Sequence, residues 1–169
     1  MIKQSAVEMD AGVRCAIGSA LVRVPSALYL MTAAHGRVSS GALVSLVQQV
    51  GFDPPMVAVA LAKGRSVVPV LHNAHCFALN EVAADDRVVL RRFASHIDDE
   101  DVLASYKRVD SVTGAPVLER AVSWLDCELV RHVDIESDHD LYVGMVRSAG
   151  VRSDAGVVNV RLRDDGFGY

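Results

Sequence analysis

The clearest pattern of apolar and polar positions lies in the first half of the chain. Residues 41–50 alternate in a way that predicts one extended strand. Its two faces would carry Leu43, Ser45, Val47 and Gln49 on one side and Val44, Leu46, Gln48 and Val50 on the other. Pro54 and Pro55 predict a rigid corner, because prolines fix φ and cannot donate a backbone hydrogen bond. Residues 56–62 carry no charge and predict a second strand, buried on both faces.

A basic turn and a helix start follow this second strand. Lys63, Gly64 and Arg65 stand before Ser66. Ser66 is a candidate N-cap for a helix whose first residues would be 67–71. A helix N-terminus offers unpaired N–H groups and a partial positive charge, so a phosphate would be well placed there. The alternative interpretation is a capped surface helix with solvated cations. The residues of this turn leave both interpretations open.

The rest of the chain consists mostly of short strands and turns. A weak helical pattern covers residues 5–21, with Asp10 as a possible cap, and short helical pieces are predicted at 88–94 and 101–106. Further strands are predicted at 27–33, 76–80, 121–133, 141–147 and 157–163, and acidic turns or loops at 98–101 and 138–140. Strands and helices do not alternate regularly. The pattern therefore predicts a mainly β protein, a barrel with a few short helices, in a single domain over residues 1–169.

Composition narrows the class of protein. The 169 residues are 51% hydrophobic with a mean hydropathy of +0.25, yet no stretch reaches the roughly 20 apolar residues of a membrane span. The surplus apolar surface predicts a core or a subunit interface. A net charge of -4 and the lack of a basic arm argue against nucleic acid as a partner. The first residues lack a secretory signal pattern, which predicts a cytoplasmic location.

Candidate metal and nucleophile sites are weak. His72, His75 and Cys76 share a helical face, but the helix is expected to end near Asn73, so no metal site is predicted. The cysteines are predicted to be buried free thiols: Cys15, Cys76 and Cys127. No nucleophile elbow, G-x-G-x-x-G or Walker pattern is present, so a nucleotide would have to bind in another way. His139 is interpreted either as a solvated turn residue or as a ligand.

Three segments, 41–55, 57–65 and 77–80, together resemble the flavin reductase-like family of FMN-binding split barrels. The greatest likeness is to the flavin reductase domain of diflavin flavoproteins. The similarity continues through 92–93, 114–118, 125–128, 138–146 and 163–167. Each motif alone is unspecific, whereas their order and spacing are specific.

The resemblance implies a mainly β split barrel of Greek-key type that forms a homodimer and holds FMN near the subunit interface. It places Val44, Ser45 and Val47 against the isoalloxazine ring, with Gln49 on the predicted face of Ser45. It also implies further site residues: Lys63, Arg65 and Ser66 on the phosphate segment, Asn80 at a strand end, and His139 as the catalytic candidate, orienting the ring or meeting charge at N1 or O2.

The family has members with two roles, and the resemblance implies either. One is an NAD(P)H:flavin oxidoreductase that passes electrons to a redox partner protein or a monooxygenase. The other is an FMN-binding carrier or storage protein without enzymatic activity. Leu43 and the turn Ser137-Asp138-His139 depart from the family pattern and would permit the second role. A haem-binding split barrel is a third alternative, for which no axial-ligand pattern is present. In all flavin cases the protein mainly orients the cofactor, because hydride transfer is the flavin's own chemistry.

Overall fold

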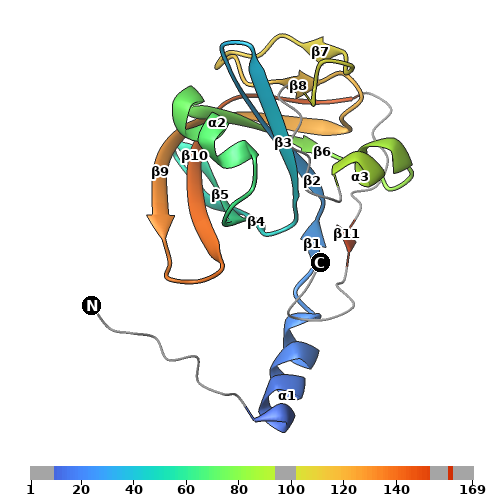
Figure 1. Cartoon of the computed structure of the whole chain (residues 1–169), viewed down its shortest axis with the longest axis vertical. Coiled ribbons are helices and arrows are strands. Elements are labelled where there is room, and N and C mark those ends of the chain that lie inside the picture. Colours follow the sequence, from blue (N-terminus) through green and yellow to red (C-terminus); the bar gives the residue numbers. More distant parts are fainter. Residues whose placement is uncertain (1–9, 94–101, 153–159, 162–169) are drawn as a thin grey trace. The chain divides into compact units, whose positions relative to one another are not determined.

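The computed structural model describes residues 10–93, 102–152 and 160–161 (Figure 1). The described residues fall into two units, which we treat separately. The larger unit holds the described residues between 27 and 152, and the smaller unit holds residues 10–26 and 160–161. That the whole chain forms one domain stays a prediction.

Seven antiparallel strands form the main sheet of the larger unit. They are β2 (Tyr29–His35), β3 (Val38–Val44), β4 (Val47–Phe52), β5 (Pro55–Ala62), β6 (Cys76–Glu81), β9 (Ser123–Asp134) and β10 (His139–Val151). Their order in the sheet is β3-β2-β6-β9-β10-β5-β4. The edge strands β3 and β4 are separated in the chain by only Ser45 and Leu46. The sheet must therefore curl until its edges approach, as in a barrel that is not fully closed.

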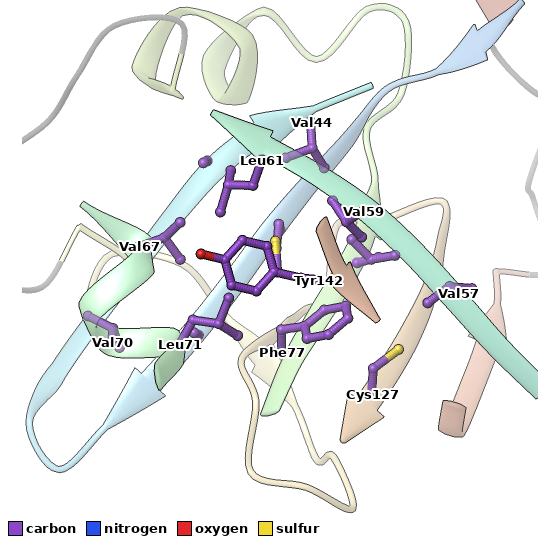
Figure 2. Close-up of a cluster of buried hydrophobic side chains, with 14 residues drawn as sticks. Val44, Val57, Val59, Leu61, Val67, Val70, Leu71, Phe77, Cys127 and Tyr142 are labelled. Atoms are coloured by element: carbon purple, nitrogen blue, oxygen red, sulfur yellow. The ribbon is translucent and has the colours of Figure 1, made fainter. Parts of the chain in front are cut away.

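Alternate side chains of these strands fill the interior of the barrel (Figure 2). Helix α2 (Val67–Ala74) adds the apolar side of its first two turns to the same cluster. Members of this cluster include Val57, Val59 and Leu61 of β5, Val67, Val70 and Leu71 of α2, and Phe77 of β6. Figure 2 shows the Tyr142 ring of β10 in the middle of the cluster. Removal of this apolar surface from water is the main force that holds the barrel together.

Gly144 makes room for the largest interior side chains. A Cβ atom added at this glycine would lie 2.5 Å from the Phe77 ring and 2.9 Å from the Cys127 Cβ. The register between β10 and β9 also shifts between Val143 and Gly144. A glycine in a strand often marks such a bulge or close approach. Any larger residue here would displace the Phe77 ring.

The outer face of the sheet carries two smaller apolar clusters. One lies beneath α3 (Arg87–Phe93) and includes Leu30, and the other includes Ala78 of β6. The second cluster adjoins a loop that Asp126 holds, because its carboxylate accepts hydrogen bonds from Val112 N at 2.7 Å and Thr113 N at 3.0 Å. Two short strands, β7 (Arg108–Val109) and β8 (Val117–Leu118), form a separate pair at this side.

The smaller unit contains helix α1 (Ala11–Leu21), Ser26 of β1 (Ser26–Ala27) and β11 (Val160–Arg161), which pairs with β1. The Asp10 side chain caps the helix, since it accepts hydrogen bonds from Gly12 N at 2.9 Å and Val13 N at 3.3 Å. This confirms the predicted cap. Within the described part of the chain, no helix is long and apolar enough to cross a membrane.

Several predicted elements are wrong in detail. Residues 41–50 form two strands rather than one, and Val44 and Val47 pack against the same interior cluster because the alternation is interrupted between them. Residues 102–105 form a turn instead of a helix, and Cys15 is exposed rather than buried. The acidic loop at 98–101 and most of the strand at 157–163 lie outside the described residues.

Candidate functional site

One end of β5 brings together residues that are far apart in the sequence. Ala62, the last residue of β5, is the register partner of His139 in β10. Lys63 N donates a 3.0 Å hydrogen bond to Asp138 O, and on the other side Ala60 N donates to Leu46 O at 2.9 Å. The predicted site residues Ser45, Lys63 and His139 therefore belong to segments that converge on one rim of the barrel.

The Ser45 hydroxyl is an unusual group at this rim. Ser45 lies in the break between β3 and β4 and is only 9% exposed, yet its Oγ has no hydrogen-bond partner among the described residues. A buried hydroxyl without a partner is unfavourable by about 1–3 kcal/mol. This group is therefore suited to a hydrogen bond with something that the described chain does not supply.

The neighbouring positions differ in their access to a ligand. Val44 is buried in the interior cluster, and Val47 is partly buried against the same cluster. Gln49 is exposed on β4, where its Nε2 donates to Gly51 O at 3.2 Å. The predicted common face of Ser45 and Gln49 assumed one continuous strand, and the break between β3 and β4 removes that assumption. A ring-binding role for these positions stays a prediction.

The turn between β5 and α2 presents an uncompensated cation. Gly64 has φ of 77°, a left-handed conformation that glycine adopts without strain. Arg65 is half-buried, and within the described residues its guanidinium has no ion pair. Ser66 occupies the N-cap of α2 as predicted, but its side chain makes no capping bond. Instead its Oγ lies 3.2 Å from the Oγ of Ser40, a residue that is almost completely buried.

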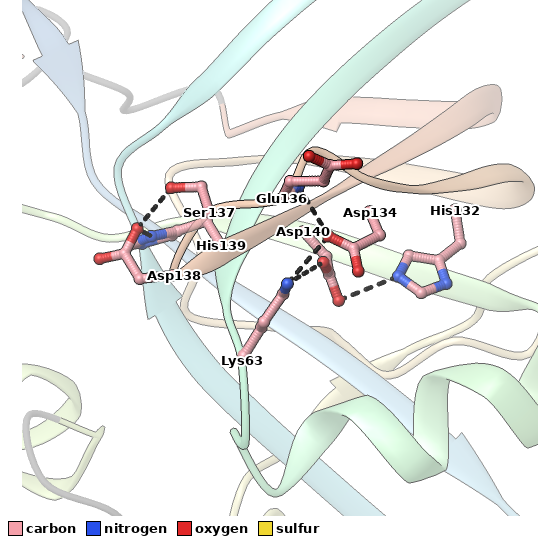
Figure 3. A network of polar contacts seen from close by, with 8 residues as sticks. All are labelled: Lys63, His132, Asp134, Glu136, Ser137, Asp138, His139 and Asp140. Atoms are coloured by element: carbon pink, nitrogen blue, oxygen red, sulfur yellow. Dashed lines mark hydrogen bonds and ion pairs between the residues drawn. The ribbon is translucent and has the colours of Figure 1, made fainter. Parts of the chain in front are cut away.

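The Lys63 side chain points toward carboxylates of β9 and β10 (Figure 3). Its Nζ lies 2.9 Å from Asp134 Oδ1 and 3.4 Å from Asp140 Oδ1. The Asp134 contact raises the pKa of the lysine and lowers the pKa of the aspartate. His132 Nε2 is 3.1 Å from the other carboxylate oxygen of Asp140. The sequence pattern did not indicate this network.

His139 lies in β10 rather than in the predicted turn, because the strand begins at this residue. Its Nδ1 is 2.9 Å from Asp138 Oδ1, and this hydrogen bond is the main reason that the pKa of Asp138 lies below its ordinary value. The His139 side chain is mostly buried beside the turn that begins at Lys63. A polar, partly buried ring at this rim is suited to orienting a ligand.

Asn80 is placed differently from the other predicted site residues. Its Nδ2 donates to Leu30 O at 3.2 Å, Thr32 Oγ1 at 3.1 Å and Pro116 O at 3.4 Å, while its Oδ1 accepts from Leu118 N at 2.7 Å. These contacts use both amide hydrogens and leave the group buried. They give Asn80 a structural role, and a direct cofactor contact stays a prediction.

Sequence reasoning missed two parts of the rim, Ser40 and the two aspartates around Lys63. For Ser40 a signal existed, since alternation through Ala42 and Val44 puts its side chain on the interior face. The possible metal ligands remain dispersed, because His75 ends α2 in a left-handed conformation and Cys76 begins β6. The described residues contain no group of side chains placed to hold a metal ion.

Comparison with known protein families decides the class. The profile described as "Flavin reductase like domain" matches residues 21–164. The chain belongs to the flavin reductase-like family. It is 29% identical over 155 residues to a putative diflavin flavoprotein A 6 of Nostoc sp., a match that covers 90% of this chain and 27% of that protein. It is 31% identical over 115 residues to a flavin reductase of Pseudomonas putida, covering 68% of this chain and 66% of that one. The chain thus spans about a quarter of the diflavin flavoproteins it matches.

Solved structures confirm the fold of this flavin reductase-like domain. An NADH:FAD oxidoreductase of Streptomyces globisporus C-1027 superposes with a TM-score of 0.70 at 24% identity, covering 79% of both chains. An FMN-binding protein from Thermus thermophilus gives 0.73 at 19% identity, covering 83% of both chains. The prediction of a mainly β split barrel with a few short helices is confirmed.

The described residues fit a flavin at the rim. Ser45 offers an unpartnered buried hydroxyl of the kind that a ring carbonyl or ring nitrogen can satisfy. Arg65 and the uncapped start of α2 offer a cation and backbone N–H groups, which suit a phosphate. These groups come from the two segments that the family resemblance assigned to ring and phosphate.

Proposed function

We propose that this domain is an NAD(P)H-dependent flavin reductase that binds FMN at the rim formed by the β3–β4 break and the turn 63–66. The observation that carries the proposal is the set of polar groups left unmet at this rim. Ser45 is buried without a partner, and Arg65 is half-buried without an ion pair among the described residues. Family membership supports flavin chemistry at such a site.

FMN is the proposed flavin because its terminal phosphate suits the turn. A phosphate monoester carries up to two negative charges, which a guanidinium and a helix N-terminus can stabilise together. Both lie within residues 65–67 here. The Streptomyces enzyme is described as acting on FAD and the Thermus protein as binding FMN. FAD is therefore the competitor that a binding measurement must include.

The chain's own contribution is to bind and orient. The flavin supplies hydride acceptance from the reduced nicotinamide when it is bound. Ser45 would fix the ring by a hydrogen bond, and Arg65 with the start of α2 would fix the phosphate. His139 would add an orienting contact at the ring, with its own Nδ1 held by Asp138. No general base is required, because the transferred group is a hydride.

A homodimer completes this proposal. Apolar side chains stay exposed at two separate places on the sheet: Val50 and Phe52 (89% exposed) near the turn from β4 into β5, and Val130, Val133 and Ile135 on the β9–β10 hairpin. Large apolar side chains exposed at the edge of a sheet are candidates for burial in an interface between subunits. The acceptor of the electrons, a redox partner protein or a monooxygenase, is likewise a proposal, and the cytoplasmic location stays a prediction.

Anaerobic absorption spectroscopy tests the activity. The protein is loaded with FMN and mixed with NADH or NADPH, and we expect the flavin band to bleach within the time of catalytic turnover. Bleaching by dithionite alone would contradict the reductase and favour a carrier. A haem-like Soret band in the purified protein would overturn flavin binding.

A pair of arginine variants tests the location. Arg65→Met should weaken FMN binding by about tenfold or more, the expected loss of a charge-assisted hydrogen bond. Binding of riboflavin, which lacks the phosphate, should stay unchanged. Arg91→Met on the exposed face of α3 is the matched control. Equal losses for FMN and riboflavin would remove the phosphate from this turn.

A further inference from the structure

Lys63 and Arg65 belong to the same basic turn but have different surroundings. The Lys63 ammonium contacts carboxylates from both strands of the β9–β10 hairpin, Asp134 at 2.9 Å and Asp140 at 3.4 Å (Figure 3). The Arg65 guanidinium has no carboxylate partner among the described residues. Sequence position alone makes the two cations equivalent, whereas the structure does not.

The hairpin itself requires a cation at this place. Asp134 and Asp140 are direct register partners across β9 and β10. Like charges directly opposite each other on neighbouring strands destabilise their pairing. Lys63 lies between them, and it also continues β5, whose Leu61 is the other register partner of Asp140. The lysine therefore links the start of the turn to the hairpin and offsets the repulsion within it.

The Asp140 carboxylate is held from two sides. Its Oδ1 faces Lys63, and its Oδ2 is 3.1 Å from His132 Nε2. The Asp140 side chain is only 15% exposed, and the His132 ring stacks on Tyr142 of the interior cluster with centroids 4.6 Å apart. One anchor of Lys63 is thus fixed by the barrel itself. A lysine with two carboxylate neighbours also presents little net positive charge to an approaching phosphate.

We propose that Lys63 is a positioning residue that fixes the turn 63–66 to the β9–β10 hairpin, while Arg65 is the cation that contacts the ligand's phosphate. This inference rests on the proposed function, since it assigns roles within the same phosphate site. Lys63 acts through the geometry of the turn. Arg65, two residues later, then presents its guanidinium beside the start of α2.

Asp134 and Asp140 allow the two possible roles of Lys63 to be distinguished. If Lys63 binds the phosphate, the aspartates compete with the phosphate for it. If Lys63 is a tether that holds the turn 63–66 in place, the aspartates support FMN binding. The experiment measures FMN and riboflavin dissociation constants for the full chain carrying Asp134→Asn and Asp140→Asn together. A tether predicts that FMN binding weakens about threefold to fivefold, with riboflavin binding unchanged. Stronger or unchanged FMN binding would overturn the proposal, because it would show that the ion pairs of Lys63 hinder FMN binding or do not affect it.

A double-mutant cycle adds a second, independent readout. Lys63→Met should weaken FMN binding to the same small extent as the paired aspartate change, and the triple variant should be no weaker than either. Additive losses would contradict a shared tether. Lys63→Arg keeps both ion pairs and should bind FMN within about twofold of wild type. A variant that only loosens the fold would lose riboflavin as well, which separates a structural defect from positioning.

The salt dependence of FMN binding decides whether Lys63 contacts the phosphate or only holds the turn. Ionic strength screens direct contacts with the phosphate, so Arg65→Met should flatten the salt dependence of FMN binding and Lys63→Met should leave it unchanged. The opposite assignment would show Lys63 as the ligand. If wild type binds FMN no more tightly than riboflavin and Arg65→Met changes neither, the phosphate site itself fails, whatever the lysine and aspartate variants show.

Discussion

Asn80 and Ser45 are both buried polar side chains, and they differ in whether the described chain supplies hydrogen-bond partners for them. Asn80 is 1% exposed and donates or accepts hydrogen bonds through both ends of its amide. Ser45 is 9% exposed, and its hydroxyl has no partner among the described residues. The first lies at the centre of a satisfied network, and the second lies at the rim where the segments of the candidate site converge.

The difference indicates where a ligand is needed. Buried polar groups in folded proteins nearly always have hydrogen-bond partners, so an unmet group requires an explanation. For Asn80 the explanation is complete within the chain. For Ser45 it is not, and the half-buried Arg65 without an ion pair lies at the same rim. The sequence makes both residues site candidates, but of the two only Ser45 keeps hydrogen-bonding capacity for a ligand.

The largest change in stability is expected from removing the Asn80 amide, whose hydrogen bonds are all made within the chain. Asn80→Leu keeps the approximate volume but leaves Leu118 N, and the carbonyls that the amide contacts, without this partner. We expect the free energy of unfolding to fall by roughly 3 kcal/mol, the cost of breaking a buried network. Urea unfolding measures it. A fall below about 1 kcal/mol would show that the network is replaceable.

The same variant also separates structure from binding. Under conditions where Asn80→Leu is folded, its FMN dissociation constant should equal that of wild type. A selective loss of FMN with unchanged stability would instead make Asn80 a cofactor contact, as the family resemblance implies.

Local sequence signals predicted the elements that depend on neighbours in the chain. The uncharged run before Lys63 is β5, and Asp10 caps α1. The basic turn and the start of α2 at Val67 also lie where the sequence predicted them. These features follow from turn residues, caps and periodicity over a few positions.

Features set by distant parts of the chain could not be predicted in this way. The pairing of Asp134 with Asp140, and of both with Lys63, depends on the register of three strands. The break at Ser45 arises because the chain passes from one edge of the sheet to the other, which alternation alone does not reveal. The Ser45 hydroxyl lies in this passage from β3 to β4, which is why the sequence did not reveal that it lacks a hydrogen-bond partner in the described chain.

An intermediate effect is expected at Ser45. Ser45→Ala removes a hydroxyl that has no partner in the described chain, so the stability of the flavin-free protein should stay constant or rise by up to about 1 kcal/mol. Flavin affinity should fall by about fivefold, equal to one hydrogen bond of about 1 kcal/mol. Thermal unfolding and flavin titration measure the two changes.

Thr32→Val is the matched control for this substitution. The Thr32 hydroxyl is buried and donates to Pro116 O at 2.6 Å, so its removal should lower stability by about 1 kcal/mol and leave flavin affinity unchanged. If both hydroxyl deletions destabilised the flavin-free protein equally, the distinction between satisfied and unmet groups would fail.

The smallest effect is expected at the exposed end of the rim, where Asp138 and His139 form a pair. Asp138 is 85% exposed, and its pKa is lowered first by the hydrogen bond with His139 and second by that with Ser137. A carboxylate with a lowered folded pKa adds stability above its unfolded pKa, and this contribution disappears as the pH falls through the folded pKa. His139→Leu should therefore raise the pKa of Asp138 toward its ordinary value, and Ser137→Ala should raise it less. Carboxyl NMR titration measures both, and an Asp138 that titrates at its ordinary value in wild type would contradict the pairing. Because water can replace the lost partner at this exposed site, stability should change far less than in Asn80→Leu, where no solvent reaches the broken network.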